Sequence, residues 1–237
     1  MKLPRLTYWH DTTPRAGALN MALDEAMLNQ ATDPWLRVYG WDKPSISIGF
    51  SQTVASIPDP YKAWPVVRRW TGGGVVVHDS DWTYTLVAPR GHPLCEQPAP
   101  QTYHWIHEAM IAALEEAGIH GGMLQPLNTS DGMGICFVEP AKFDVVLAGQ
   151  KIAGAGQRRT RAGLLHQGTL QPTRVPYDFG ALFSRHLADA VSELSQPSAE
   201  ALLLPEAQSL ATHKYGAVSW LSERTPASSS ALANSGG

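Results

Sequence analysis

The turn of three consecutive glycines in RRWTGGGVVVHD constrains the fold of this chain more than any other feature. β-Branched residues flank it in Val66–Arg69 and Val75–His78, so the segment predicts a strand, a bare turn and a second strand. Glycine has no Cβ, which lets a backbone take positive φ and approach a ligand closely. The amide groups of such a turn suit an anion, and the forked donors of Arg68 and Arg69 precede it. We interpret the segment as a cradle for a carboxylate, phosphate or thioester; a glycine-rich hairpin with exposed arginines is the alternative.

The composition is that of an ordinary soluble globule, with 43% hydrophobic residues, 16% charged residues and a net charge of −3. This charge gives no general affinity for nucleic acid or membrane surfaces. Met1–His10 lacks the apolar core of a signal peptide, and no run reaches the roughly 20 apolar residues of a membrane span. The two cysteines, Cys95 and Cys136, make neither a disulfide framework nor a zinc site. We expect a cytoplasmic protein without a metal and with neither a nucleic-acid nor a membrane partner.

Hydrophobic periodicity predicts helices before and after a group of β-hairpins. Helices are expected over Gly17–Gln30, Tyr103–Ala117 and Tyr177–Leu194, with a weaker segment over Gln208–Leu221. Strands are expected over Leu6–Trp9, Leu36–Tyr39, Ser45–Gly49, Val66–Arg69, Val75–His78, Trp82–Val87, Phe143–Leu147, Lys151–Ala155 and Leu164–Leu170, and Gly121–Gly134 is expected to be a loop. This order predicts an α+β fold with mixed or antiparallel sheets and helices packed on one side. We expect residues 1–224 to form one domain and residues 225–237, rich in Ala and Ser, to be a disordered tail.

Polar residues within these elements allow two readings. Asp24 and Glu25 fall on the polar side of the first helix, which favours a solvated face over a site. His104 and His107 lie on the second helix; we interpret them as surface or core residues, because no second pair at metal-binding spacing accompanies them. Ser47 and its small neighbours two residues away give one strand face where another group can approach closely.

Lys151 stands on a predicted hairpin arm between Gly149 and Gly154, among apolar residues. Partial burial would make its amine a proton acceptor or a single-point hydrogen-bond donor, and the glycines would clear space around it. A surface lysine on an edge strand is the alternative. Cys136 lies upstream, where the charge of Lys151 could favour its thiolate; the alternative is a small buried hydrophobe. Arg158, Arg159 and Arg161 follow, as a solvated loop or a contact for an acidic protein.

Four segments, in order, resemble motifs of the biotin/lipoate protein ligase and octanoyltransferase superfamily. They are TTPRAGALNMALDEAML, WLRVYGWDKPSISIGFSQ, RRWTGGGVVVHD, and GQKIAGAGQRR followed by GLLHQGTL. The resemblance covers most of the chain. It implies the class II biotin/lipoate ligase-like catalytic domain, which is an α+β fold.

Within this superfamily, the segment Cys136-Phe-Val-Glu-Pro140 resembles the CF-x-x-P of cysteine-dependent octanoyltransferases, and the Q-R-R after GAG is similar to their pattern. Lipoate-protein ligases have an Asn-Asp pair, used with magnesium, where this chain has Phe143-Asp144. The complete GGG turn, in contrast, is as in ligases. The chain is short for a ligase with an extra C-terminal domain, which fits a transferase and also a ligase whose accessory domain is separate.

The resemblance to the transferases implies covalent acyl transfer without a cofactor. Cys136 would attack the thioester of octanoyl- or lipoyl-acyl-carrier protein, and Lys151 would hold the carbonyl and help deprotonate the incoming lysine. The acceptor would be a lipoyl domain, such as the glycine cleavage H protein or an E2 subunit. Backbone amides near Gly73 or Gly154 would hold the oxyanion. The substrate-binding residues that the resemblance implies are Arg68, Arg69, Gly72, Gly73, Gly74, His78, Asp144, Gly154, His166 and Gly168.

Three points stay open. His78 is either catalytic or ties the glycine turn. Ile46, Ile48, Val76 and Leu165 line either a tunnel for an eight-carbon chain or a packed core. The function itself has two alternatives: an ATP- and magnesium-dependent lipoate-protein ligase, in which Cys136 is dispensable, and a non-catalytic protein that binds lipoyl domains or acyl carriers.

Overall fold

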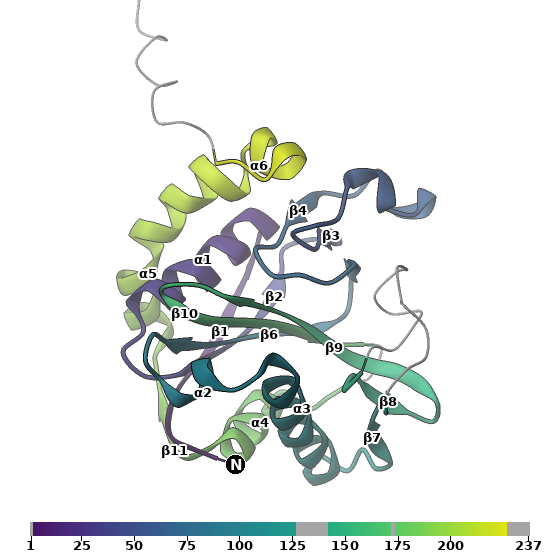
Figure 1. Cartoon of the computed structure of the whole chain (residues 1–237), viewed down its shortest axis with the longest axis vertical. Helices are drawn as coiled ribbons and strands as arrows, with labels where there is room; N and C mark the ends of the chain where they lie inside the picture. The colour runs from purple at the N-terminus through teal and green to yellow at the C-terminus, as the bar shows by residue number, and fades with distance from the viewer. Residues whose placement is uncertain (1, 127–141, 172–173, 227–237) are drawn as a thin grey trace, which may run out of the picture.

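One large mixed sheet organises the part of the chain that the computed structural model describes, which is residues 2–126, 142–171 and 174–226 (Figure 1). Its strand order is β11-β1-β2-β6-β10-β9-β8-β7. The bounds are β1 Leu3–Arg15, β2 Trp35–Trp41, β6 Trp82–Pro89, β7 Gly122–Leu124, β8 Val145–Leu147, β9 Gln150–Arg159, β10 Gly163–Leu170 and β11 Ala188–Glu193. β1 runs parallel to both of its neighbours, and the other pairs are antiparallel.

A second, smaller sheet has the order β4-β3-β5. It consists of β4 Val66–Arg68, β3 Ser45–Ile48 and β5 Val75–His78, so the glycine turn connects its two outer strands. Ser47 pairs with Val67 in parallel and with Val76 in antiparallel register. This confirms the strand, turn and strand expected around the glycines. The short 3₁₀ helices η1 Val54–Ser56 and η2 Asp59–Tyr61 lie in the connection from β3 to β4.

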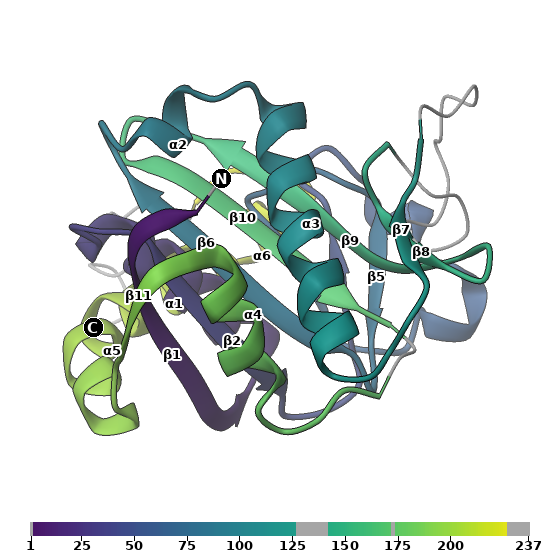
Figure 2. The same ribbon diagram turned by 90° about the horizontal axis from the view of Figure 1, so that it is seen from below.

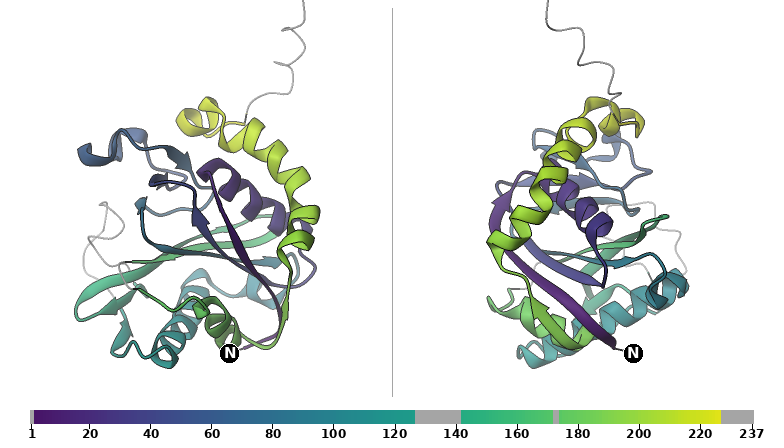
Figure 3. Two further views of the ribbon diagram at one scale, coloured as in Figure 1. Left: turned by 180° about the vertical axis from the view of Figure 1, so that it is seen from behind. Right: turned by 90° about the vertical axis from the view of Figure 1, so that its left-hand side faces the viewer.

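Helices cover both faces of the large sheet. α1 Gly17–Gln30 and α5 Gln196–Leu210 lie side by side on one face, whereas α3 Ala99–Glu116 and α4 Phe179–Leu187 lie on the other (Figures 2 and 3). The remaining helical segments are α2 Pro93–Glu96, the π-helical η3 Ala211–Tyr215 and α6 Val218–Glu223. Among the residues described, no helix is both long and apolar enough to cross a bilayer.

The α+β class with mixed sheets is confirmed. The helices, however, pack on both sides of the large sheet and not on one side as expected. The cause is visible in β2, where Leu36 and Val38 contribute to the core beneath α3 and α4, and Trp35 and Tyr39 to the core beneath α1 and α5. Successive strand residues point to opposite faces, so both faces of β2 are apolar and both need cover.

The prediction that Asp24 and Glu25 form a solvated face is wrong. Asp24 is 0% and Glu25 8% exposed, because α1 is enclosed by the sheet, α5 and η3. Each carboxylate is paired. Asp24 accepts from Arg37 at 2.8 Å and Glu25 accepts from Lys214 at 2.6 Å, so charge inside this helix is neutralised by contacts that are distant in sequence.

The helix expected over Tyr177–Leu194 is half as long. α4 ends at Leu187, and the next six residues form β11, which pairs with β1 from Leu3↔Ala188 onward. The free edge of β1 offers ladder hydrogen bonds, which outweigh the helical propensity of this segment. Similarly, the loop expected over Gly121–Gly134 contains β7, which pairs with β8.

Candidate functional site

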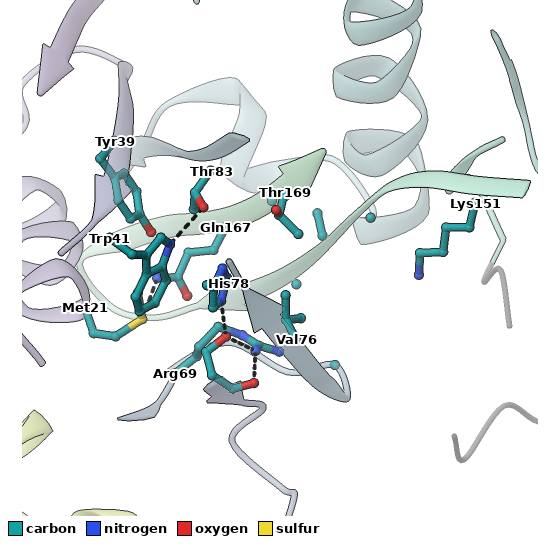
Figure 4. Close-up of a pocket in the computed structure, with 16 residues that line it drawn as sticks. Met21, Tyr39, Trp41, Arg69, Val76, His78, Thr83, Lys151, Gln167 and Thr169 are labelled. Carbon is teal, nitrogen blue, oxygen red and sulfur yellow. Dashed lines mark hydrogen bonds between the residues drawn. The ribbon is translucent and has the colours of Figure 1, made fainter. Parts of the chain in front are cut away.

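A pocket lies between the two sheets (Figure 4). It encloses about 450 Å³ of atom-free space, its open mouth included. Lys151 lies at one end and Tyr39, Trp41 and Met21 at the other. The residues that line it are Met21, Tyr39, Trp41, Ser47, Arg69, Gly73, Val76, His78, Thr83, Lys151, Gly154, Ala155, Gly156, Gln167, Gly168 and Thr169. This lining combines apolar walls with a few polar groups.

Lys151 forms a buried ion pair with Asp144, in which Nζ and Oδ2 are 2.7 Å apart. A register shift where β8 meets β9 breaks the alternation of the strand, so Lys151 shares the pocket face with Gly154 and Gly156. A Cβ on Gly154 would lie 2.7 Å from Cε of Lys151. Gly154 therefore clears the space for this side chain, whereas Gly149, with φ 78°, serves the turn from β8 to β9.

The glycine turn lies directly on neighbouring backbone. A Cβ on Gly49 would be 1.9 Å from the carbonyl oxygen of Gly73, and one on Gly156 would be 2.6 Å from that of Gly72. Gly73 itself has φ 95°. The turn thus needs glycine within it and glycine on the two strands that it touches, as the small-residue face of β3 predicted.

Arg69 holds the shape of this turn from inside. It donates to the carbonyls of Gly72 at 3.1 Å and Gly74 at 3.0 Å, and to both the carbonyl and Oγ of Ser47. Arg68 binds elsewhere: its guanidinium donates to the carbonyls of Gly49, Phe50, Gln52, Trp220 and Leu221. Both arginines are buried, which excludes the alternative of a hairpin with exposed arginines.

His78 connects the large sheet to Arg69. Its Nδ1 is 2.7 Å from Oδ2 of Asp81, and its Nε2 is 2.7 Å from Oγ of Ser47. Burial raises the pKa of Asp81, but the pairing with His78 and hydrogen bonds from it and two threonines outweigh this and hold that pKa below its ordinary value. Since a carboxylate accepts, Nδ1–H of His78 donates to Asp81. The imidazole also stacks on Trp41, with ring centroids 3.8 Å apart.

This Ser-His-Asp connectivity resembles a hydrolytic triad, but its far end is occupied by Arg69 and, through it, by the carbonyls of the turn. These contacts tie His78 to the glycine turn through Ser47 and Arg69. The partner carboxylate is Asp81, not the Asp79 of the sequence motif.

A second buried chain of hydrogen bonds reaches the turn from α1. Asp24 accepts from Nε2 of Gln167 at 2.7 Å, and Oε1 of Gln167 accepts from Thr71 at 2.7 Å. Thr85 and Tyr39 also donate to Asp24. Sequence reasoning missed Asp24, Gln167 and Thr71 as site-supporting residues, because the chain links positions 143 and 96 apart.

The pocket lining contains half of the twelve residues that the resemblance implied, namely Arg69, Gly73, His78, Lys151, Gly154 and Gly168. His166 lies on the opposite face of β10, fully buried and bound to Tyr84 and Gln157. Gly168 contributes backbone to the pocket, and a Cβ there would meet the ring of Tyr84 at 2.4 Å. Of the expected tunnel residues, Val76 lines the pocket, whereas Ile46, Ile48 and Leu165 belong to packed cores.

The structure also shows where two of the arginines that follow Lys151 lie. Arg158 is stacked on Phe50 and Trp70, and Arg159 donates to Thr102, so these arginines of β9 are committed to the fold. Cys136 lies outside the described residues. Within the described ranges, no three His, Cys, Asp or Glu side chains are arranged to hold a metal ion.

A family model described as the lipoyl protein ligase A/B catalytic domain matches residues 16–183 of this chain. The chain belongs to that family. The matched range contains every lining residue of the pocket, from Met21 to Thr169. The lipoyl protein ligase A/B membership confirms the resemblance seen in the sequence motifs.

Relatives within and around this family are similar over most of the chain. An octanoyltransferase LipM of Oceanobacillus iheyensis is 34% identical over 168 residues, which are 68% of this chain and 62% of that protein. The chain thus spans about three fifths of the length of the relative that it matches. A T. acidophilum structure assigned to the lipoate protein ligases, with bound lipoic acid, has a TM-score of 0.70 at 21% identity and covers 93% of this chain and 99% of that one. A lipoate-protein ligase A bound with ATP has a TM-score of 0.69 at 21% identity, over 93% and 98%. These structures establish the lipoate-ligase fold.

Proposed function

We propose that this protein is an acyltransferase of protein lipoylation, which moves an octanoyl or lipoyl group from acyl-carrier protein to a lysine of a lipoyl domain. The observation that carries the proposal is the Lys151–Asp144 pair, buried at one end of a pocket of mainly apolar lining. The octanoyltransferase name of the 34% identical relative supports the acyl group and the transfer.

In this proposal the acyl chain lies along β9, over Gly154, Ala155 and Gly156, with its carbonyl near Lys151. Nζ of Lys151 donates to the carbonyl oxygen, and amides of the glycine turn or of Gly154 stabilise the negative charge that develops on it. Asp144 accepts from Nζ and keeps the lysine aimed at this end of the pocket.

The reaction has two steps. The Cys136 thiolate attacks the thioester carbon, the bond to the carrier sulfur breaks, and the carrier thiol leaves with a proton. The ε-amine of the acceptor lysine then attacks the new thioester, its proton passes to the departing Cys136 sulfur, and an amide forms as that thiol leaves. The acceptor is a lipoyl domain of an H protein or an E2 subunit, and neither ATP nor a metal takes part.

The test is the intact mass of the protein after mixing with octanoyl-acyl-carrier protein, beside Cys136→Ala and Cys95→Ala variants. A hydroxylamine-labile octanoyl adduct on the wild type and on Cys95→Ala, absent from Cys136→Ala, is the expected result. Cys95 is the matched control, because its thiol donates hydrogen bonds to backbone carbonyls of β6 and burial raises the pKa of that thiol.

Two other outcomes contradict the proposal. ATP-dependent lipoylation of an acceptor domain that survives Cys136→Ala would establish a lipoate-protein ligase. No turnover with either donor, together with binding of a lipoyl domain or an acyl carrier, would establish a non-catalytic binding protein.

A further inference from the structure

His107 lies on α3, on the side of the large sheet opposite the pocket, and is fully buried. Its Nδ1 is 2.5 Å from the carbonyl oxygen of Phe143. A carbonyl only accepts, so Nδ1 carries the proton and the imidazole is the Nδ1–H tautomer. Burial lowers the pKa of His107, and the hydrogen bond to Phe143 opposes this only in part, so the ring is neutral.

The residue that His107 binds has a strained backbone. Phe143 has φ 71°, a left-handed conformation that residues other than glycine rarely adopt. Such a conformation persists only where surrounding contacts over-determine it. Here the amide of Phe143 donates to Gln125 at 3.0 Å and its carbonyl accepts from His107, so both backbone groups of the residue are held.

Phe143 immediately precedes Asp144, whose carboxylate pairs with Lys151. The carbonyl of Asp144 in turn accepts from the amide of Gln125 at 2.8 Å. The direction in which Asp144 projects therefore depends on the conformation of Phe143. His107 contributes the one side-chain hydrogen bond to the Phe143 carbonyl that the described residues show.

The second ring nitrogen of His107 indicates that the hydrogen bond to the Phe143 carbonyl explains why a histidine occupies this position. Nε2 is buried without any hydrogen-bond partner. A buried acceptor with no donor is unfavourable, and such groups call for an explanation. An apolar side chain would avoid this cost and fill the same space. The compensating gain is at Nδ1, where the ring supports the Phe143 carbonyl.

We propose that His107 is a positioning residue for the Lys151–Asp144 pair, acting through the backbone of Phe143. This inference rests on the proposed function for its catalytic consequence, and on the geometry alone for its effect on Lys151. His107 touches neither the substrate nor the reacting atoms. His107 fixes the backbone of Phe143 and thereby the direction of the Asp144 side chain. Asp144 in turn fixes the position of the Lys151 Nζ.

Two amide substitutions separate the hydrogen bond from packing. In His107→Asn the side-chain amide nitrogen takes the place of Nδ1 and can donate to Phe143; in His107→Gln it takes the place of Nε2 and cannot. Both remove the ring. The matched control is His104→Asn, because His104 contacts the Phe143 ring at 5.1 Å from one turn earlier on α3 but leaves its carbonyl alone.

Two readouts are compared among these variants. The first is the kcat and KM of acyl transfer to a lipoyl domain. We expect His107→Gln to lower kcat by about 10- to 100-fold with little change in KM, as a displaced catalytic group would. His107→Asn and His104→Asn should stay within about threefold of wild type. Equal melting temperatures of the Asn and Gln variants at position 107 would show that packing loss is matched.

The second readout needs no enzymatic activity. It is the rate at which limiting trinitrobenzenesulfonate modifies Lys151, followed by peptide mass spectrometry. Lys151 should react faster in His107→Gln than in wild type and His107→Asn. A wild type without transferase activity would overturn the proposed function while leaving this readout to decide the inference. Equal kcat and equal labelling in the Asn and Gln variants, or a defect confined to the Asn variant, would overturn the positioning role.

Discussion

Nζ of Lys151 and Oδ2 of Asp144 are 2.7 Å apart, and both side chains are more than nine-tenths buried. Removing one member leaves the other charge buried and unpaired. We expect Lys151→Met to lower the free energy of unfolding by about 3–5 kcal/mol.

The double variant Lys151→Met/Asp144→Asn removes both charges and should recover most of that loss without recovering acyl transfer. Urea denaturation of the wild type, the two single variants and the double variant gives the coupling energy directly. Additive losses would mean that the two groups do not interact, which would contradict the pairing.

Gly49 approaches the glycine turn too closely for any side chain, since a Cβ there would lie 1.9 Å from the carbonyl oxygen of Gly73. We expect Gly49→Ala to push the turn out of place, to cost about 1–3 kcal/mol of stability and to lower transfer activity. Gly40→Ala is the matched control, because a Cβ on this β2 glycine meets nothing within 4 Å. Urea midpoints and transfer rates measure both effects. Equal midpoints and equal rates in the two variants would contradict the close contact proposed between Gly49 and the turn.

The buried histidines predict how stability changes with pH. Burial lowers the pKa of His166 well below 6.5, and burial also lowers that of His107. Because these folded-state pKa values lie below the unfolded one, the unfolded chain takes up protons first as the pH falls through about 6.5. Stability should therefore decrease below that pH, by at most about 1.4 kcal/mol per pH unit for each histidine.

Urea denaturation between pH 5 and 7 measures this slope. His166→Gln removes one titrating group and should flatten it. A slope in His166→Gln as steep as in the wild type would contradict the assignment.

Arg68 and Arg69 should differ in what their substitution damages. Arg68 binds carbonyls near it in the sequence, such as that of Gly49, and also the distant carbonyls of Trp220 and Leu221. Lysine has no forked donors, so Arg68→Lys should loosen α6 and lower stability by about 1–3 kcal/mol. Arg69→Lys should mainly raise KM, because Arg69 shapes the pocket side of the turn. Thermal melts and steady-state kinetics on both variants test the contrast; identical profiles would count against it.

Local patterns predicted much of this fold. The bounds of α1 follow from a 3.6-residue apolar period, and β5 follows from its β-branched run after the glycines. The pairing of α1 with α5 and of β1 with β11 could not be predicted in this way, because each depends on segments more than 150 positions apart. The prediction of a solvated Asp24 is wrong for a different reason, because a charged residue on a helix gives no local sign that Arg37 will neutralise it.

The candidate site also combines residues that local patterns predict with residues that only the fold brings together. Lys151 and the glycine turn were identified from their neighbours in sequence, because glycines on both sides of a lysine indicate cleared space. Ser47 carried a weaker signal in the small-residue face of β3. Asp81 and Gln167 carried none, since their roles arise only when the large sheet brings them beneath the turn.

The contacts of Arg68 have a consequence for the order in which the chain matures. During synthesis the glycine motif leaves the ribosome early, whereas the carbonyls of Trp220 and Leu221 that its first arginine binds follow 152 and 153 positions later. Likewise, the outer edge of strand β1 stays uncovered until β11 has been synthesised. In a nascent chain, Arg68 therefore lacks two of its carbonyl partners until α6 has been synthesised.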